Sequence, residues 1–279
     1  MRVMRASALT AIAIILFGRE AVAMQLKDGA TKVVVVTPDE VVNRHVRRLV
    51  EAALKTAPSP KGHKVRITWK HHVLYNRTFP EIMVPVNAAG KADGVEQYRG
   101  PLGHQVLHSV TYKNGLKDGP EKFFRSMQNK HYLAEEIPWK AGKVHGQKRS
   151  YYPDGAVRSE TAYANGFANG PTRTLGPKGK LKRSGEMKDG KRHGAMTDYD
   201  TKTGKPRRIV HYVDGRVQGT VVEYYVNGKV KRESEFRDDA RCGLTTEYDA
   251  KGAKTRERYY YDNEPVSKSE YERRIAKKK

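Results

Sequence analysis

The sequence predicts a mainly β protein, in which tandem β-hairpins of about 24 residues form an elongated antiparallel sheet behind a small N-terminal α/β element. Three observations predict this fold class. A Gly-x-x-x-Gly motif recurs at a nearly constant period, and an aromatic residue or Met stands three residues before most of the first glycines. The mean hydropathy of −0.78 and the 25 glycines among 279 residues favour a thin sheet over a deep core.

The first 23 residues have the pattern of a secretory signal peptide. Arg2 and Arg5 precede an apolar run at 6–18, and Ala21-Val22-Ala23 has the small-x-small pattern of a signal-peptidase site. We expect cleavage after residue 23 and an exported chain, periplasmic or secreted, in a bacterium. An uncleaved membrane anchor stays open as the alternative.

Residues 24–86 are predicted to form the small α/β element. The β-branched run at 32–36 indicates a buried strand, and alternation at 64–69 indicates a second strand. Between them, Thr37-Pro38-Asp39-Glu40 is a capping-box signature that is followed by apolar residues at helical spacing, so a helix is expected to about residue 56.

Residues 87–263 are predicted to form about seven hairpin repeats. The first glycines of successive motifs are separated by 25, 27, 24, 24 and 25 residues, and Asp239 takes this place in the last unit. Asn-Gly and Asp-Gly supply the positive φ that tight hairpins need. The expected structural turn glycines are Gly90, Gly115, Gly142, Gly166, Gly190, Gly215 and Gly228.

Three further expectations concern the array and its end. The aromatic row is expected to be the spine of the core. The longer unit between Gly119 and Trp139 is expected to interrupt the sheet with a loop or bulge. Residues 264–279 are expected to be a flexible basic tail, because they end in five closely spaced cations.

The unit Y-x-[ND]-G-x3-G-x4-[YF]-x3-G resembles the MORN repeat, in the bacterial variant often labelled as an antitoxin component. The resemblance covers about Asn87 to Tyr261. It implies an elongated, twisted antiparallel sheet with a scaffolding role in protein–protein contacts, and in some members contact with phospholipid.

The net charge of +23 favours an anionic partner. Basic residues stand three and four positions after the second turn glycine of successive repeats, so we expect them to form rows on both faces of the sheet. The alternative is a solvated face, partly neutralised by Glu160, Glu233 and Glu257. The candidate binding residues are Arg158, Lys182, Arg183, Arg207, Arg208, Lys231, Arg232 and Arg256.

These observations predict a non-enzymatic exported scaffold that binds an acidic protein or an anionic envelope membrane through a basic, Tyr-rich face. No catalytic or cofactor motif is present. The histidines lack the spacing of a metal site, and the single cysteine, Cys242, is expected to be structural. Two alternatives stay open: a nucleic-acid-binding or antitoxin-like protein if the N-terminus is retained, and an enzyme with a site in 24–86 or near Gln128.

Overall fold

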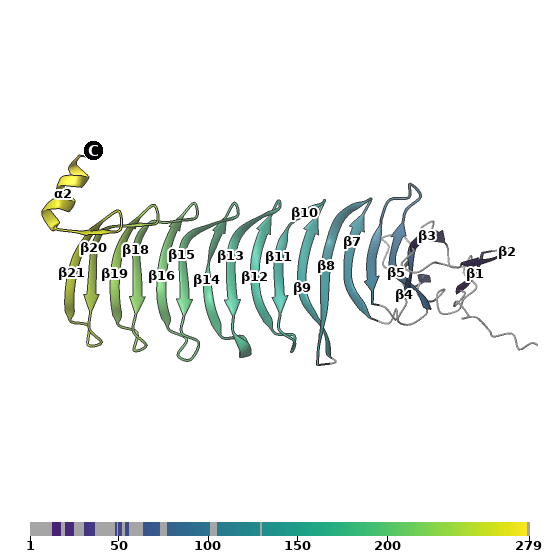
Figure 1. Ribbon diagram of the computed structural model, residues 1–279, viewed down its shortest axis with the longest axis horizontal. Coiled ribbons are helices and arrows are strands. Elements are labelled where there is room, and N and C mark those ends of the chain that lie inside the picture. The colour runs from purple at the N-terminus through teal and green to yellow at the C-terminus, as the bar shows by residue number, and fades with distance from the viewer. Residues whose placement is uncertain are drawn as a thin grey trace, which may run out of the picture. The chain divides into compact units, whose positions relative to one another are not determined.

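The computed structural model describes residues 13–17, 20–24, 31–36, 48, 50–51, 54–55, 64–72, 77–100, 105–128 and 130–277. The chain divides into two compact units, 1–143 and 144–279. In each unit, hairpin strands follow one another in sequence order and pair antiparallel with their neighbours (Figure 1). The predicted fold class, mainly β with tandem antiparallel hairpins, is confirmed.

The first unit begins with a two-stranded pair, β1 (Ala13–Phe17) with β2 (Glu20–Met24), which lies within the predicted signal peptide except for its last residue, Met24. This pairing does not test cleavage, so the leader stays a prediction. The main sheet of the unit consists of β3 (Thr31–Val36), β4 (Lys64–His72), β5 (Arg77–Val86), β6 (Gly94–Arg99), β7 (Val106–Lys113), β8 (Leu116–Met127) and β9 (Lys130–Lys140).

The predicted strands of the N-terminal element are present as β3 and β4. Residues 48, 50, 51 and 54 are helical, in the C-terminal part of the predicted helix, and the rest of that helix lies outside the described residues. Val50 and Leu54 are buried, as are Val65 and Ile67 of β4. β5 pairs with β6, so the element and the first repeat strand share one sheet.

The longer unit after Gly119 does not interrupt the sheet. Its extra residues lengthen β8 and β9, which pair from Gly119↔Trp139 to Met127↔Lys130. The ladder has one bulge, after Phe123, and the hairpin turns at Gln128, whose φ is 49°. The expected bulge is therefore present, but it does not interrupt the sheet, because pairing resumes at Phe124↔Leu133 and continues to the end of the hairpin.

The second unit contains β11 (Gly146–Tyr151), β12 (Val157–Ala164), β13 (Phe167–Leu175), β14 (Leu181–Lys188), β15 (Lys191–Tyr199), β16 (Pro206–Val213), β17 (Arg216–Val217), β18 (Gly219–Tyr224), β19 (Val230–Arg237), β20 (Ala240–Tyr248), β21 (Lys254–Tyr261) and β22 (Glu264–Val266). The two-residue strand β10 (Lys143–Val144) stands where the units divide. A short 3-10 turn, Pro177–Gly179, joins β13 to β14.

Two kinds of turn alternate along the repeats. At the first kind, both central residues have positive φ, as in Asn165-Gly166 (52° and 95°) and Asp238-Asp239 (48° and 71°), which is the type I′ hairpin turn. The second kind closes a longer loop, in which Gly228 N–H donates to the Tyr225 carbonyl at 2.9 Å. All seven expected turn glycines have positive φ.

The type I′ turns are also hydrogen-bonded from one repeat to the next. Gly190 N–H donates to the Ala168 carbonyl at 2.9 Å, and Gly215 N–H donates to the Arg192 carbonyl at the same distance. Equivalent bonds start from Gly115, Gly142, Gly166, Asp239 and Asn263. The first slot of the motif therefore links the turn of one hairpin to the strand of the previous one, except at Gly90, whose N–H donates to the Asn87 carbonyl within its own turn.

The second glycine of each motif is the cross-strand partner of the next aromatic or Met. The pairs are Gly94↔Tyr112, Gly119↔Trp139, Gly146↔Tyr163, Gly170↔Met187, Gly194↔Tyr212, Gly219↔Phe236 and Gly243↔Tyr260. These side chains are only half-buried, whereas Val110, Met196, Val210 and Val221 are buried. The aromatic row therefore covers the glycines and is not the spine of the core, contrary to expectation.

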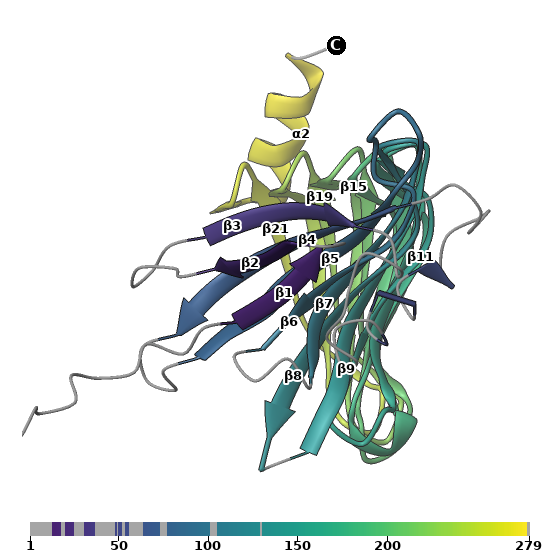
Figure 2. The ribbon, with the colours of Figure 1, turned by 90° about the vertical axis from the view of Figure 1, so that its right-hand side faces the viewer.

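The C-terminal segment is ordered to residue 277 and is not the flexible tail that its charge suggests. It forms β22 and then α2 (Lys268–Ala276), which Ser267 caps by accepting from Glu270 N–H. Tyr271 packs against Tyr259 of β21, with ring centroids 5.5 Å apart. Both views show α2 projecting beyond the type I′ turns of its unit (Figures 1 and 2).

Candidate anion-binding face

A β-bulge follows the longer turn of each repeat in the second unit. In β14, Arg183 pairs with Thr174 and Leu181 pairs with Leu175, so Lys182 has no partner of its own. A bulge of this kind places two residues opposite one and breaks the strict alternation of side chains. The same register shift occurs at Arg158, Arg207, Lys231 and Thr255.

The first predicted row of cations therefore consists of bulged residues. We call Arg158, Lys182, Arg207 and Lys231 the bulge row. All four side chains are exposed. Within the described part of the chain, no carboxylate lies within ion-pair distance of any of them. Lys231 Nζ instead stands 5.8 Å from the ring centroid of Tyr225. The bulge row thus carries four solvated charges that are not neutralised within the unit.

The second predicted row has a different environment, because each of its arginines alternates with an acidic residue of the intervening strand. Across the sheet the order is Arg183, Asp198, Arg208, Glu223, Arg232, Glu247, Arg256, each the register partner of the next. We call these seven residues the charge ladder. Its charges alternate in sign along its whole length.

Several neighbours in the charge ladder form ion pairs. Arg183 Nε donates to Asp198 Oδ1 at 2.5 Å, and this hydrogen bond raises the pKa of the Arg183 guanidinium. Glu223 Oε1 lies 2.8 Å from Arg232 Nη2 and 3.9 Å from Arg208 Nε. Half of the expected binding residues are therefore placed beside carboxylates.

Glu160, Glu233 and Glu257, which were expected to neutralise part of the basic face, interact with residues outside the two rows. Glu160 pairs with Arg149 and Arg173, at 3.5 and 2.7 Å. Glu257 pairs with Lys254 at 2.6 Å, and Glu233 accepts from the Tyr248 hydroxyl. Glu160 thus forms the cross-strand ion pairs that the alternative expected, but with arginines outside the candidate set. The carboxylates in ion pairs with candidate arginines are Asp198 and Glu223.

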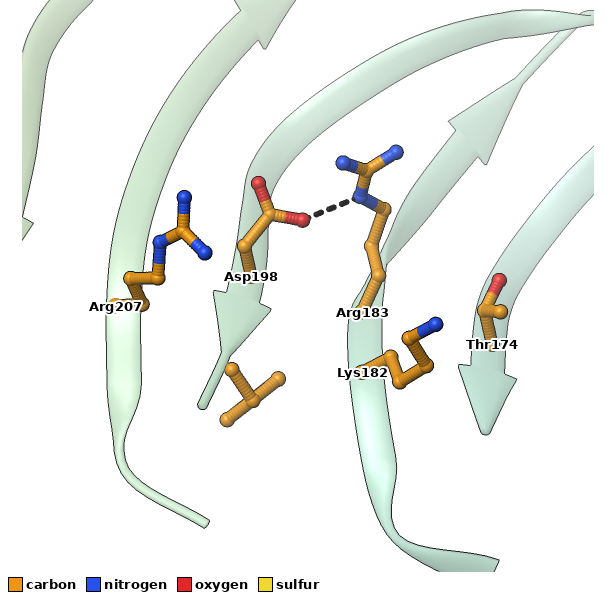
Figure 3. A pocket seen from close by; sticks show the side chains of 6 residues that line it. Thr174, Lys182, Arg183, Asp198 and Arg207 are labelled. Carbon is orange, nitrogen blue, oxygen red and sulfur yellow. Dashed lines mark hydrogen bonds and ion pairs between the residues drawn. The ribbon is translucent and has the colours of Figure 1, made fainter. Parts of the chain in front are cut away.

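The two rows meet on one face of the second unit. Lys182, Arg183, Asp198 and Arg207 line a single shallow cavity of about 390 Å³ together with Thr174. Figure 3 shows these side chains standing on the same side of their strands, with the guanidinium of Arg183 turned toward Asp198. The expectation of one row on each face is therefore wrong here, because the bulge rotates Lys182 to the side of its neighbour. The eight cations and three carboxylates of the two rows leave five net positive charges.

A cluster of polar side chains in the first unit surrounds Glu121, which is only 4% exposed. Its Oε1 accepts from Lys117 Nζ at 2.9 Å and lies 2.9 Å from His108 Nε2, and its Oε2 accepts from Trp139 Nε1 at 2.8 Å. Burial favours a raised pKa for Glu121, but the hydrogen bonds from Lys117 and His108 outweigh it and lower the pKa.

Glu96 is the second carboxyl of this cluster, and burial raises its pKa. Converging carboxyls and a histidine are groups that an acid–base enzyme requires. Here, however, every oxygen of Glu121 is engaged by a donor of the same sheet, and the His108 ring stacks on Phe123 at 4.3 Å. The cluster therefore joins β7, β8 and β9, and no analogous signal in the repeat pattern predicted it.

Cys242 is a free, half-buried thiol. His104 lies outside the described residues. Among the residues that the structure describes, no three His, Cys, Asp or Glu side chains gather as metal ligands. In the same part of the chain, no helix has the length and apolar composition needed to cross a bilayer. Neither a protein-family model nor a curated protein matches this chain.

Proposed function

We propose that this protein is a non-enzymatic, exported MORN-like scaffold whose second unit binds an acidic protein. The single observation that carries the proposal is the bulge row, four exposed cations at one position of successive repeats with no carboxylate partner in the described chain. A partner that supplies carboxylates to these positions gains charge complementarity without displacing an internal ion pair.

The charge ladder favours an acidic protein over an anionic membrane or a nucleic acid. Asp198, Glu223 and Glu247 lie on the same face as the bulge row, within the charge ladder. A dense polyanion laid over this face places phosphates beside these carboxylates, and like charges at short distance repel. A protein can place its carboxylates at separate points and leave the ladder in contact with neutral groups.

The proposal is tested with the full chain and three fluorescent or sedimentable probes. The probes are a labelled poly-L-glutamate, phosphatidylglycerol vesicles and a single-stranded oligothymidylate, each at low and at high salt. We expect salt-sensitive binding of poly-L-glutamate that is tighter than binding of the other two probes. Failure to bind poly-L-glutamate, or tighter binding of vesicles or of oligothymidylate, overturns the proposal.

A charge-matched pair of variants localises the binding. Replacing Lys182, Arg207 and Lys231 together by Gln removes three charges from the bulge row. Replacing Lys178, Lys202 and Lys251 by Gln removes three charges from exposed turns of the same unit. Only the first variant is expected to lose affinity. Equal losses indicate attraction to net charge alone and contradict a defined binding face.

A further inference from the structure

We infer that the bulge row docks an acidic segment in the polyproline II conformation, with a carboxylate at every third residue. The inference rests on the proposed function and adds to it the conformation and the charge spacing of the partner. It follows from the positions of the four cations in the sheet and from the apolar surface beside them.

The spacing of the bulge row follows from the strand order. Its members stand on β12, β14, β16 and β19, and one strand lies between each successive pair, namely β13, β15 and β18. Neighbouring strands are about 4.7–4.9 Å apart, so successive cations recur at about 9.4–9.8 Å. The four cations therefore extend over about 28–29 Å.

A polyproline II segment matches this interval. It has three residues per turn and a rise of about 3.1 Å, so every third side chain lies on the same edge at about 9.3 Å. Over three intervals the mismatch with the bulge row is at most about 1.5 Å. The long side chains of Lys and Arg absorb a difference of that size by changing rotamer.

The other regular conformations match less well. Same-face side chains of a β-strand recur at about 6.6–6.8 Å, so only every third of them, at about 20 Å, comes close to a cation, and that cation is the second along the row. Every seventh residue of an α-helix recurs at about 10.5 Å, so the fourth carboxylate is displaced by about 2–3 Å. Duplex DNA carries one charge per about 1.7 Å of axis, far denser than the row.

Apolar side chains lie directly beside the cations. Tyr224, Tyr225 and Val226 line a small notch that Arg207 also lines, and Val226 is 67% exposed. Lys231 Nζ lies over the ring face of Tyr225. Domains that bind polyproline II segments pack prolyl rings against aromatic side chains, and this notch offers such a surface between two cations.

The experiment compares two labelled peptides of identical composition by fluorescence anisotropy with the full chain. One is Glu-Pro-Pro repeated four times. The other has the four glutamates contiguous between prolines, so that charge, length and proline content are unchanged. We expect the periodic peptide to bind about tenfold more tightly, a difference of about 1.4 kcal/mol. The preference for the periodic peptide is expected to disappear in the bulge-row variant, Lys182/Arg207/Lys231→Gln. It is expected to persist in the control variant, Lys178/Lys202/Lys251→Gln.

The outcomes separate this inference from the proposed function. If both peptides bind equally and both are lost in the bulge-row variant, the face binds acidic segments, but the inferred spacing is wrong. If neither peptide nor poly-L-glutamate binds, the proposed function fails as well. If the control variant also loses the preference, the bulge row does not set the spacing and the inference is overturned. Far-ultraviolet circular dichroism of each variant verifies that the sheet is retained.

Discussion

Replacement of Glu121 by Gln tests whether the polar cluster of the first unit is a structural centre. The carboxylate is almost fully buried and is contacted by donors from two residues of its own hairpin and one of the preceding strand. A hydrogen bond to a charged group contributes about 1.5–3 kcal/mol, and removing one member of a buried ion pair costs about 3–5 kcal/mol. Glutamine keeps the volume and one acceptor oxygen, so we expect a loss of about 2–4 kcal/mol.

The assay is urea unfolding followed by tryptophan fluorescence. Trp139 donates to Glu121, so its emission reports on this cluster, and Trp69→Phe removes the only other tryptophan. The control is Glu223→Gln, which removes a carboxylate that is 25% exposed and whose ion pairs contribute about 1 kcal/mol or less. If both variants unfold at the same urea concentration, the buried cluster contributes no more than a surface pair and the reasoning fails.

The pH dependence of the same unfolding transition has a defined sign. Hydrogen bonding lowers the pKa of Glu121 in the folded protein, so its stabilising effect is complete above the ordinary carboxyl value of 4.5 and is lost as the pH falls through the lower folded value. Burial raises the pKa of Glu96. Its effect on stability is therefore opposite: the folded protein gains stability as the pH falls and Glu96 becomes protonated. Stability measured in a Glu96→Gln background is therefore expected to fall more steeply below pH 4.5 than in a Glu96→Gln/Glu121→Gln background. Equal slopes in the two backgrounds contradict the assignment.

Three other variants have defined outcomes. Gly243→Ala is expected to destabilise the chain by about 1–3 kcal/mol more than Gly219→Ala in thermal unfolding, because its new Cβ meets Glu235 Cβ at 2.8 Å whereas that of Gly219 has nothing within 4 Å. Ala141, at a φ of 47°, takes the place filled by Asn or Asp in other type I′ turns, so Ala141→Asn is expected to raise the unfolding free energy by up to about 1 kcal/mol. Glu223→Gln removes a carboxylate from the charge ladder, and tighter poly-L-glutamate binding is expected by anisotropy; weaker binding contradicts the proposed role of the face.

The sequence predicted the hairpins well because their turns are determined locally. Positive φ at two successive central residues favours Gly, Asn or Asp, and these residues recur at a nearly constant period. Asp239 was expected to replace glycine in the seventh unit, and its φ of 71° agrees with that expectation. The turn at Asp262-Asn263 lacked glycine altogether, so the pattern gave no sign of it or of the strand β22 that follows.

The candidate site was predicted only in part, because its environment depends on strand pairing. The arginines were found by their distance from the second turn glycine, a count along one strand. Their carboxylate partners lie on the other strand of the same hairpin. Glu223 stands five residues before Gly228 and Arg232 four residues after it, so folding the chain about this turn already places them opposite each other. The Glu121 cluster had no repeated signal in the sequence, because these residues occur together in one hairpin repeat alone.

The bulge explains why the two rows differ although they are adjacent in sequence. A residue in a regularly paired part of a strand has a cross-strand partner. If a cation recurs at such a position in every repeat, its partner recurs as well. At the charge ladder that partner is acidic, so the arginines are neutralised by the protein itself. A bulged residue has no cross-strand partner, and a repeated cation there stays without an internal counterion. The extra residue after the long turns therefore adds periodic free charges to a face whose other charges alternate in sign, and this periodicity is the property that a binding partner can recognise.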